Sequence, residues 1–369
     1  MSYLECKVLI VGGGPAGASA ARELAARGVE TLLLEKDSNF VKPCGGGIPS
    51  GAFTELGLPE SLCKAKVTSL RIFPPESEPY EVPFDQGFIG IVERGEFDSA
   101  LRDMAKVEDA AIIKGAFMKF ISAGKEIVSQ AEIDGEKAEI RSEYVIAADG
   151  VNSRVRSALG IRPVKSVFTL SGKFPVSSDF CEFYFGESSK GGYSWVFPAS
   201  GGRAHVGIGN VKPREARTGF LEFLSTKGLS GNGSFRGYRI PLWEPESKER
   251  PLAKGKVLLV GDAAGFVMPF TFEGIYYAIR SGQFAAEAII KERPGDYRRL
   301  WAKRFSIRFR LMKEIWSRYL QDERGMETLL GVIRNRGVQV GAMRLWLDKK
   351  SGKGSLLAFI KALKKFRLF

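Results

Sequence analysis

The chain has 369 residues, of which 44% are hydrophobic and 26% are charged, and its net charge is +13. This balance is typical of an ordinary globular protein with two or three packed units. We expect no membrane-spanning helix, because no apolar run reaches about 18 residues, and no metal site, because the four cysteines form no CxxC pair.

The positive charge is concentrated in the C-terminal region. Residues 291–369 contain 21 lysines and arginines but only 7 acidic residues, a local charge of +14, so the first 290 residues sum to −1. No signal peptide is evident, because Glu5 and Lys7 run directly into an apolar segment. We therefore expect a cytoplasmic protein whose basic end needs a local explanation.

Residues 7–36 carry the clearest pattern in the chain. An apolar run ends at Val11, the turn Gly12-x-Gly14-x-x-Gly17 follows, and an alanine-rich helix leads to a second apolar run that ends in Glu35. This order of strand, glycine turn, helix, strand and acid predicts a dinucleotide-binding unit, with the pyrophosphate at the helix N-terminus. Glu35 is placed to accept a hydrogen bond from a ribose hydroxyl.

The next segments alternate between loop, strand and helix signals. Residues 42–49 form a glycine-rich loop around Cys44, and residues 66–92 read as short strands with a Pro-Pro turn. A helix is predicted from Arg94 to about residue 105, and strands are predicted over 110–146 with a turn at Asp134-Gly135. The last of these strands leads into Asp149-Gly150.

Residues 164–242 are rich in short aromatic strands, which predicts the antiparallel sheet of a second unit, and a helix is expected over 213–229. His205, the only histidine, lies in one of these strands, and we expect it to be structural. The chain then returns with a buried strand at 256–260, the turn Gly261-Asp262, and a helix from about 274 to 291. From residue 296 we expect basic helices with breaks near Gly325, Gly337 and Gly352.

Three segments that are far apart in the sequence each place a glycine or an acid at the end of a predicted strand, where parallel sheets bind ligands. They are Gly12–Gly17, Asp149-Gly150 and Gly261-Asp262. This set resembles the glutathione-reductase-type FAD fold in its para-hydroxybenzoate-hydroxylase-like branch. The resemblance implies that Asp262 holds the ribityl chain and that Arg94, in an RxxFDxxL segment, contacts the flavin nucleotide.

Within that branch, the chain is similar to the geranylgeranyl reductase family. The Lys42–Pro49 loop resembles the family's Cys-x-Gly-Gly loop, and Tyr193–Pro198 resembles its YxWxFP motif. Residues 261–265 and 273–282 resemble its flavin-ring loop and the helix that follows. The chain departs from the family at Phe272, where members often have a small residue.

The pattern and the resemblance together give an α/β fold: a Rossmann-like FAD domain, an antiparallel substrate domain and a helical C-terminal region. The expected segments are 1–65, 91–160 and 251–295 for FAD, 66–90 and 161–250 for a prenyl chain, and 296–369 for the basic region. The residues expected to bind FAD are Gly12, Gly14, Pro15, Ala16, Gly17, Glu35, Lys36, Cys44, Gly45, Gly46, Arg94, Asp149, Gly150, Gly261, Asp262, Gly274 and Ile275. Those expected at the reaction centre are Cys44, Gly45, Gly46, Tyr193 and Trp195, and those expected in the substrate pocket are Tyr193, Trp195, Phe197, Pro198, Phe270 and Phe272.

The resemblance implies that reduced flavin delivers hydride from N5 to C=C bonds of geranylgeranyl chains, on a lipid or a prenyl diphosphate. NAD(P)H or a ferredoxin-like protein would supply the electrons. Two alternatives remain open, a class A flavin monooxygenase acting on aromatic compounds and a membrane-docked electron-transfer flavoprotein. The aromatic stripe at 193–197 could also be ordinary sheet core.

The basic tail predicts peripheral attachment to an anionic membrane surface. Residues 355–369 place Leu356, Phe359, Ile360, Leu363 and Phe366 on one helix face, with lysines beside it. An earlier stretch, 301–319, mixes Trp301, Phe305, Phe309 and Trp316 with arginines. The alternative is that these apolar faces pack on the protein itself. We expect no nucleic-acid partner, because no nucleic-acid motif accompanies the charge.

Overall fold

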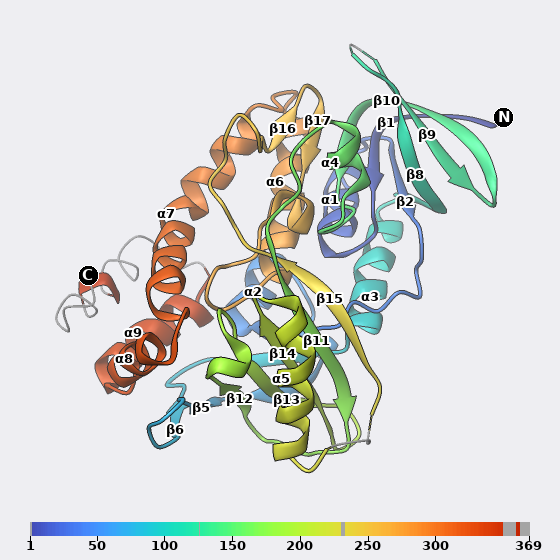
Figure 1. Cartoon of the computed structure of the whole chain (residues 1–369). Coiled ribbons are helices and arrows are strands. Elements are labelled where there is room, and N and C mark those ends of the chain that lie inside the picture. The colour runs from blue at the N-terminus through green and yellow to red at the C-terminus, as the bar shows by residue number, and fades with distance from the viewer. Residues whose placement is uncertain (1, 125, 230–232, 350–358, 362–369) are drawn as a thin grey trace. The chain divides into compact units, whose positions relative to one another are not determined.

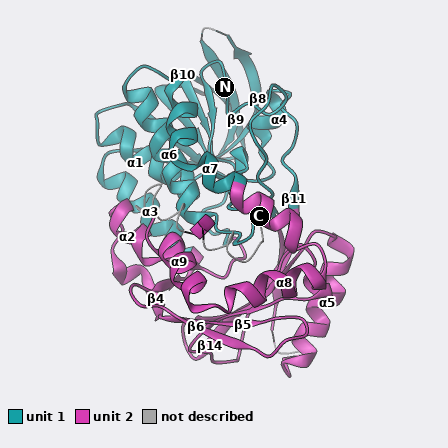
Figure 2. Ribbon diagram, turned by 90° about the vertical axis from the view of Figure 1, so that its left-hand side faces the viewer, with its two compact units in different colours: residues 1–41, 95–166, 240–310 teal, residues 42–94, 167–239, 311–369 magenta. Residues whose placement is uncertain are grey.

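The computed structural model describes residues 2–124, 126–229, 233–349 and 359–361. The chain divides into two compact units, shown in teal and magenta in Figure 2. Unit 1 comprises residues 1–41, 95–166 and 240–310, and unit 2 comprises residues 42–94, 167–239 and 311–369. Each unit is therefore assembled from three separate stretches of sequence.

Within its described residues, unit 1 has a seven-stranded sheet that combines parallel and antiparallel pairs (Figure 1). β1 pairs in parallel with β2 and β10, and β10 pairs in parallel with β17, so the carboxyl ends of these strands meet at one edge. β8, β9 and β10 form an antiparallel meander. The strands are β1 (Ser2–Val11), β2 (Thr31–Glu35), β8 (Ala111–Ala123), β9 (Ile127–Ile133), β10 (Glu136–Ala147), β16 (Ala253–Lys254) and β17 (Val257–Leu259).

Two helices of unit 1 pack together through residues too small to separate them. A Cβ atom at Gly282 in α6 would lie only 2.2 Å from the Ala16 carbonyl oxygen in α1. Only glycine permits this close approach of the two backbones. The helices that begin in or belong to this unit are α1 (Pro15–Ala25), α3 (Arg94–Val107), α4 (Arg154–Ala158), α6 (Ile275–Ile290) and α7 (Asp296–Tyr319), with a 3-10 turn, η3 (Gly261–Ala264).

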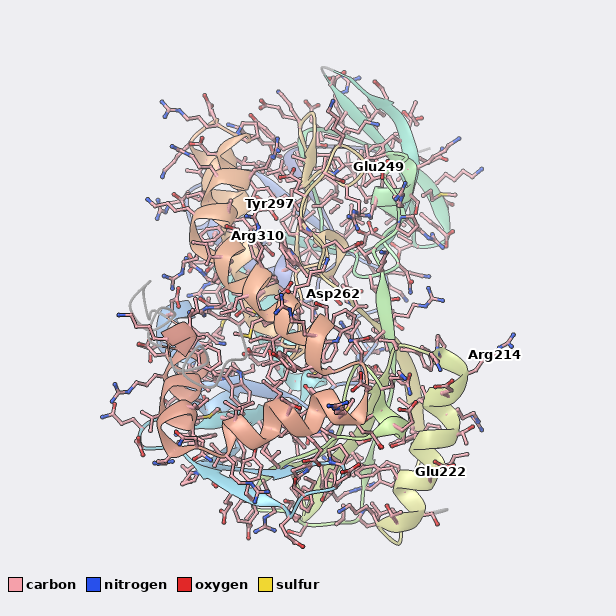
Figure 3. All side chains as sticks on the ribbon, turned by 60° about the vertical axis from the view of Figure 1, so that its left-hand side comes forward. Arg214, Glu222, Glu249, Asp262, Tyr297 and Arg310 are labelled. Atoms are coloured by element: carbon pink, nitrogen blue, oxygen red, sulfur yellow. The ribbon has the colours of Figure 1, made fainter. Side chains whose placement is uncertain are left out.

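Unit 2 is built on a second sheet, in the order β15-β11-β14-β13-β12-β5-β6, and a three-stranded sheet, β3-β7-β4. α5 (Pro213–Thr226) covers one face of the larger sheet with Phe220 and Phe223, and its exposed Arg214 points away from the strands (Figure 3). The strands are β3 (Gly47–Pro49), β4 (Cys63–Val67), β5 (Ser69–Phe73), β6 (Tyr80–Pro83), β7 (Ile89–Val92), β11 (Ser166–Phe174), β12 (Cys181–Tyr184), β13 (Ser194–Ala199), β14 (Arg203–Asn210) and β15 (Phe235–Pro241). The remaining elements are α2 (Ser50–Leu56), α8 (Glu323–Ile333), α9 (Arg336–Leu347) and the 3-10 turns η1 (Glu60–Leu62) and η2 (Glu187–Ser189).

The helix breaks in the C-terminal region fall a few residues before the predicted glycines. Gly325 lies inside α8 and Gly337 inside α9. The side chain of Asp322 accepts a hydrogen bond from the Gly325 backbone N–H, and Asn335 accepts from Gly337. The breaks are set by these N-caps rather than by glycine. The third predicted break, at Gly352, lies outside the described residues.

The two units do not follow the predicted segments at every boundary. Residues 42–65 and 91–94 belong to unit 2, because β3 and β4 both pair with β7. Residues 296–310 belong to unit 1 rather than to a separate basic region. Their aromatic side chains Trp301, Phe305 and Phe309 are at most 3% exposed and pack against Tyr277 of α6.

This packing corrects the expectation for residues 301–319, because the aromatic face of α7 in unit 1 packs on the protein. Trp316 is half-buried and donates its indole N–H to the Gly191 carbonyl. Of the predicted helix 355–369, only residues 359–361 are described; they are helical, and Phe359 is 6% exposed beside Gly341. Leu356, Leu363 and Phe366 lie outside the described residues. No helix among the described residues has the length and apolarity needed to span a bilayer.

Candidate functional site

The glycine turn of unit 1 is held by close backbone contacts. Gly12 has φ of +101°, and a Cβ there would lie 2.5 Å from the Ala148 carbonyl oxygen. A Cβ at Gly17 would lie 1.9 Å from the Gly12 carbonyl oxygen. Gly14 differs, because a Cβ at Gly14 would meet no atom within 4 Å. The turn is therefore packed tightly on the protein side and open at Gly14.

Gly14 is also the N-cap of α1, and no side chain caps this helix. Pro15 occupies the first turn, and no acidic residue lies there. The first backbone N–H groups of the helix thus lack the side-chain acceptors that usually satisfy them. Open space, free N–H groups and the positive end of the helix dipole together suit a phosphate group.

Glu35, at the end of β2, is fixed beside this turn. Its carboxylate accepts hydrogen bonds from the backbone N–H of Gly13 at 2.6 Å and of Asp37 at 2.8 Å. Arg102 of α3 donates to the Gly13 carbonyl at 3.2 Å. Arg102 was not among the predicted residues; its spacing of eight from Arg94 places it two turns further along the same helix. Lys36, predicted to bind FAD, is exposed.

Asp149 occupies the position just after β10 and supports α4. One carboxylate oxygen, Oδ2, accepts from the Val155 backbone N–H at 3.1 Å. The other, Oδ1, is buried and has no hydrogen-bond partner among the described residues. Burial raises the pKa of this carboxyl above its usual value. An unsatisfied buried oxygen at a strand end indicates a missing donor, such as a ligand hydroxyl.

The third segment brings α6 to the same edge of the sheet. A Cβ at Gly261 would lie 2.9 Å from the Ala16 Cβ, so the Gly-Asp turn lies against α1. The N-cap of α6 is Gly274, which provides no side-chain cap, and an atom added there would lie 3.7 Å from Asp262 Oδ1. Ile275 is the first residue of α6 and is buried. A second uncapped helix N-terminus and the Asp262 carboxylate are thus neighbours within unit 1.

The loop between Gly265 and Gly274 contains two strained residues. Phe270 has φ of +77° and Phe272 has φ of +51°, a region that bulky side chains rarely adopt. The loop is held by hydrogen bonds from Met268 to the Glu273 carbonyl and from Phe272 to the Met268 carbonyl. Strain of this kind is often found at binding sites. Both phenylalanines are half-buried in unit 1.

The Cys44 loop lies in unit 2, where it packs directly on the YxWxFP strand, β13. A Cβ at Gly45 would lie 2.7 Å from a ring carbon of Phe197 and 3.2 Å from the Trp195 indole nitrogen. Gly46 has φ of +75°, and its backbone N–H donates to Cys44 Sγ at 3.3 Å. The structure thus brings together two motifs that are 150 residues apart in the sequence.

Tyr193, Trp195 and Phe197 form an aromatic cluster with Phe183 and Trp346. Trp195 and Phe197 are 6% and 8% exposed, so the stripe is packed core as well as a candidate slot. Pro198, next in β13, is buried. The indole N–H of Trp195 is buried and has no acceptor among the described residues. A buried donor of this kind beside a glycine loop is again suited to a ligand.

A polar group borders the aromatic cluster on the same sheet. His205 is the register partner of both Phe197 and Lys173, so these three side chains share one face. Glu93, the residue after β7, accepts a hydrogen bond from Lys173 Nζ at 2.7 Å and lies 3.5 Å from His205 Nε2. His205 first, and then Lys173, hold the pKa of Glu93 well below its usual value.

The predicted residues are therefore divided between the two units. Unit 1 carries the glycine turn, Glu35, Asp149-Gly150, Gly261-Asp262, Gly274 and both loop phenylalanines. Unit 2 carries the Cys44 loop, the YxWxFP strand and Arg94, which begins α3 and is 8% exposed. The residues of unit 1 fit FAD, because two uncapped helix N-termini, an open glycine and an unsatisfied aspartate oxygen converge at one sheet edge.

Comparison with known proteins identifies an FAD-binding fold and a family of reductases. The sequence pattern of a family described as "FAD binding domain" matches residues 5–218, more than half of the chain. The geranylgeranyl diphosphate reductase of Rhodobacter capsulatus is 31% identical over 95% of this chain and 94% of its own length. The digeranylgeranylglycerophospholipid reductase of Thermoplasma volcanium is 31% identical over 76% of each chain.

The likeness extends to a solved structure. A geranylgeranyl bacteriochlorophyll reductase-like protein from Thermoplasma acidophilum superposes with a TM-score of 0.82, covering 99% of both chains at 25% identity. The α/β fold with an FAD-binding domain and FAD itself as the cofactor are thus established from both sequence and structure. This chain belongs to the geranylgeranyl reductase family of FAD-dependent oxidoreductases.

Proposed function

We propose that the protein reduces C=C bonds of geranylgeranyl chains that are carried by a lipid or by a diphosphate. The observation that carries this proposal is the contact between Gly45 and the rings of Trp195 and Phe197, which joins the two motifs typical of the family. The names of the relatives from Rhodobacter capsulatus and Thermoplasma volcanium support the same substrate class.

An isolated alkene has no carbonyl for a protein to polarise, so the residues act mainly by orientation and by excluding water. When bound and reduced, FAD would supply the hydride from its N5 atom. The buried aromatic faces of β13 suit an apolar chain, and the lack of a side chain at Gly45 lets the Cys44 loop pack directly on these rings.

In unit 1, the uncapped N-terminus of α6 would stabilise negative charge that develops beside it. Asp262 would hold a hydroxyl of the ribityl chain, and Glu35 a ribose hydroxyl. We infer that electrons arrive from NAD(P)H or from a ferredoxin-like protein.

The direct test is anaerobic. The bound flavin is reduced, candidate prenyl lipids and prenyl diphosphates are added, and reoxidation is followed by absorbance. Mass spectrometry should find a gain of two hydrogens for each double bond saturated. A flavin that is reoxidised only by oxygen, with hydroxylation of an aromatic compound, would support the monooxygenase instead. A flavin that is reoxidised only by a redox partner protein would support an electron carrier.

We also propose that the protein works at an anionic membrane surface. The solvent face of α7 carries the exposed cations Arg299 and Lys303, and Ile307 beside them is 56% exposed. An exposed isoleucine among basic residues is typical of interfacial helices. We therefore propose that this solvent face contacts lipid, and not the aromatic face of the same helix, which is buried.

A further inference from the structure

Unit 1 contains a cavity of about 250 Å³ that the proposed reaction does not use. Its walls come from residues 156 and 164, from the chain segment 242–252, from residues 264–266 just after the Gly-Asp turn, and from residues 298–310 of α7. Four arginines line it, namely Arg156, Arg250, Arg298 and Arg310. The residues of α7 recur every four positions, at 298, 302, 306 and 310, so one face of the helix forms this wall.

Two carboxylates in the cavity wall neutralise two of these arginines. Glu244 forms an ion pair with Arg250, and Glu246 pairs with Arg298 at 2.8 Å. Glu246 also accepts a hydrogen bond from the Leu252 backbone N–H at 3.0 Å. The two acids are thus already engaged, and the remaining positive charge is not balanced from within the cavity.

Arg156 is a buried cation without a carboxylate partner among the described residues. It is 4% exposed and donates to the main-chain carbonyls of Arg162 and Ala263, each at 2.7 Å. Burial, together with the charge of Arg250, lowers the pKa of Arg156 to about 10. A buried charge of this kind is costly unless an anion approaches it.

Two further donors face no acceptor. Arg250 Nε is buried and has no hydrogen-bond partner among the described residues. Arg310, labelled on α7 in Figure 3, is exposed and forms no hydrogen bond or ion pair with any described residue. Guanidinium groups bind phosphate oxygens in a forked geometry, and several of them around one cavity suit more than one phosphate oxygen.

We propose that this cavity binds an anion bearing phosphate or diphosphate. Trp243, Phe266 and Trp301 supply an apolar wall beside the arginines, so the phosphate belongs to a molecule with an apolar or aromatic part. Two sources share this chemistry, the diphosphate of an isoprenoid and the phosphates of a nicotinamide dinucleotide. With an isoprenoid as the source, the assignment rests on the proposed function, whereas binding of the phosphate group itself does not.

Titration calorimetry of the FAD-loaded full chain with inorganic diphosphate, at ionic strength fixed with chloride, tests the proposal. Saturable binding is expected. Arg310→Gln should weaken it by about tenfold, as the loss of one charge-assisted contact implies. Because Arg310 is exposed, this variant should fold normally. Arg293→Gln, an exposed arginine outside the cavity, is the matched control and should change the affinity less than twofold.

Competition then identifies the source of the phosphate. Displacement of diphosphate by geranylgeranyl diphosphate but not by geranylgeraniol would indicate an isoprenoid head group. Displacement by NADPH would indicate a dinucleotide. Absence of saturable diphosphate binding, or equal weakening by Arg310→Gln and Arg293→Gln, would overturn the proposal. Neither result affects the reoxidation assay for the prenyl reaction, which fails or succeeds separately.

Discussion

At the scale of single residues, Gly45 and Gly14 have opposite surroundings. Gly45 has no room for a side chain, because aromatic rings of the same unit lie against it. Gly14 has ample room for a side chain, so no contact within the protein requires a glycine there. The first glycine is explained by packing, and the second is explained by a ligand that approaches the backbone.

We expect Gly14→Ser to separate folding from FAD binding. Its backbone has φ of −72° and ψ of −175°, ordinary values for an N-cap, where serine is favoured. The apoprotein should therefore be at least as stable as the parent in thermal unfolding. The serine side chain should occupy the space for the pyrophosphate and weaken FAD binding by about tenfold or more. Unchanged affinity, measured by fluorescence titration, would place the pyrophosphate elsewhere.

Gly45→Ala should destabilise unit 2. The added Cβ would lie 2.7 Å from the Phe197 ring, so the ring or the loop must move, at a cost of about 1–3 kcal/mol. Urea unfolding measures the difference. Gly295→Ala is the control, because a Cβ there would meet no atom within 4 Å. A Gly45→Ala protein as stable as this control would show that the loop does not pack on β13.

Cys44 should be positional rather than an obligate nucleophile. Its side chain is half-buried, and its sulfur accepts a hydrogen bond from the Gly46 backbone N–H. Cys44→Ser can keep this hydrogen bond, so flavin binding and part of the alkene reduction should persist. Full loss of turnover with flavin still bound and reducible would assign the thiol a chemical role.

At the scale of elements, the ends of the strands determine where the candidate site residues lie. The pairs β1–β2, β1–β10 and β10–β17 are all parallel, so these strands end at the same edge of the sheet. This edge therefore brings together four residues that span 250 positions of the sequence, namely Gly12, Glu35, Asp149 and Gly261. In unit 2, Glu93 follows the end of β7, and its carboxylate lies close to Lys173 of β11 and His205 of β14.

The contacts of Glu93 with Lys173 and His205 should make the free energy of unfolding depend on pH in the acidic range. Because the pKa of Glu93 is lowered in the folded state, its contribution is fully present above the ordinary value of 4.5 and is lost as the pH falls below it. Glu93→Gln should reduce the free energy of unfolding by about 1–3 kcal/mol at neutral pH, and less in acid. Urea unfolding across this range tests it, with exposed Glu132→Gln as the control. A pH-independent loss would mean that the effect comes from packing alone.

At the scale of the whole molecule, charge is distributed unevenly along the chain, and the structure divides the basic region between both units. Residues 291–310 extend unit 1, whereas residues 311–369 belong to unit 2. The aromatic residues of α7 within unit 1 are buried, so its cations occupy the solvent side. The fold thus separates apolar packing from surface charge along one helix.

Vesicle binding should follow this solvent face. We expect the protein to sediment with anionic vesicles and this binding to weaken as the salt concentration rises. Each engaged cation contributes about 1 kcal/mol near such a surface. Ile307→Asn together with Lys303→Gln should reduce binding severalfold and spare flavin content. Leu221→Asn on α5, where leucine is 45% exposed, is the control. If both proteins bound vesicles equally, the basic face would serve another partner.

Much of this protein is encoded in local sequence. The glycine turn, the strand that precedes it and the acid that ends the next strand each depend on neighbouring residues, so spacing alone predicted β1, α1, β2 and Glu35. The hairpin turn at Asp134-Gly135 was likewise predicted, and both residues have positive φ. The family, the fold class and FAD were accessible for the same reason, because motifs with fixed spacing carry them.

The tertiary structure alone decided which of these pieces meet. Spacing could not show that Gly45 lies on Phe197, that Arg102 reaches Gly13, or that the aromatic face of α7 is buried. These contacts join residues far apart along the chain, and burial of apolar surface, which has no direction along the sequence, selects among the possible partners. The arginine cavity has the same origin, because its charges come from separate segments that only folding brings together.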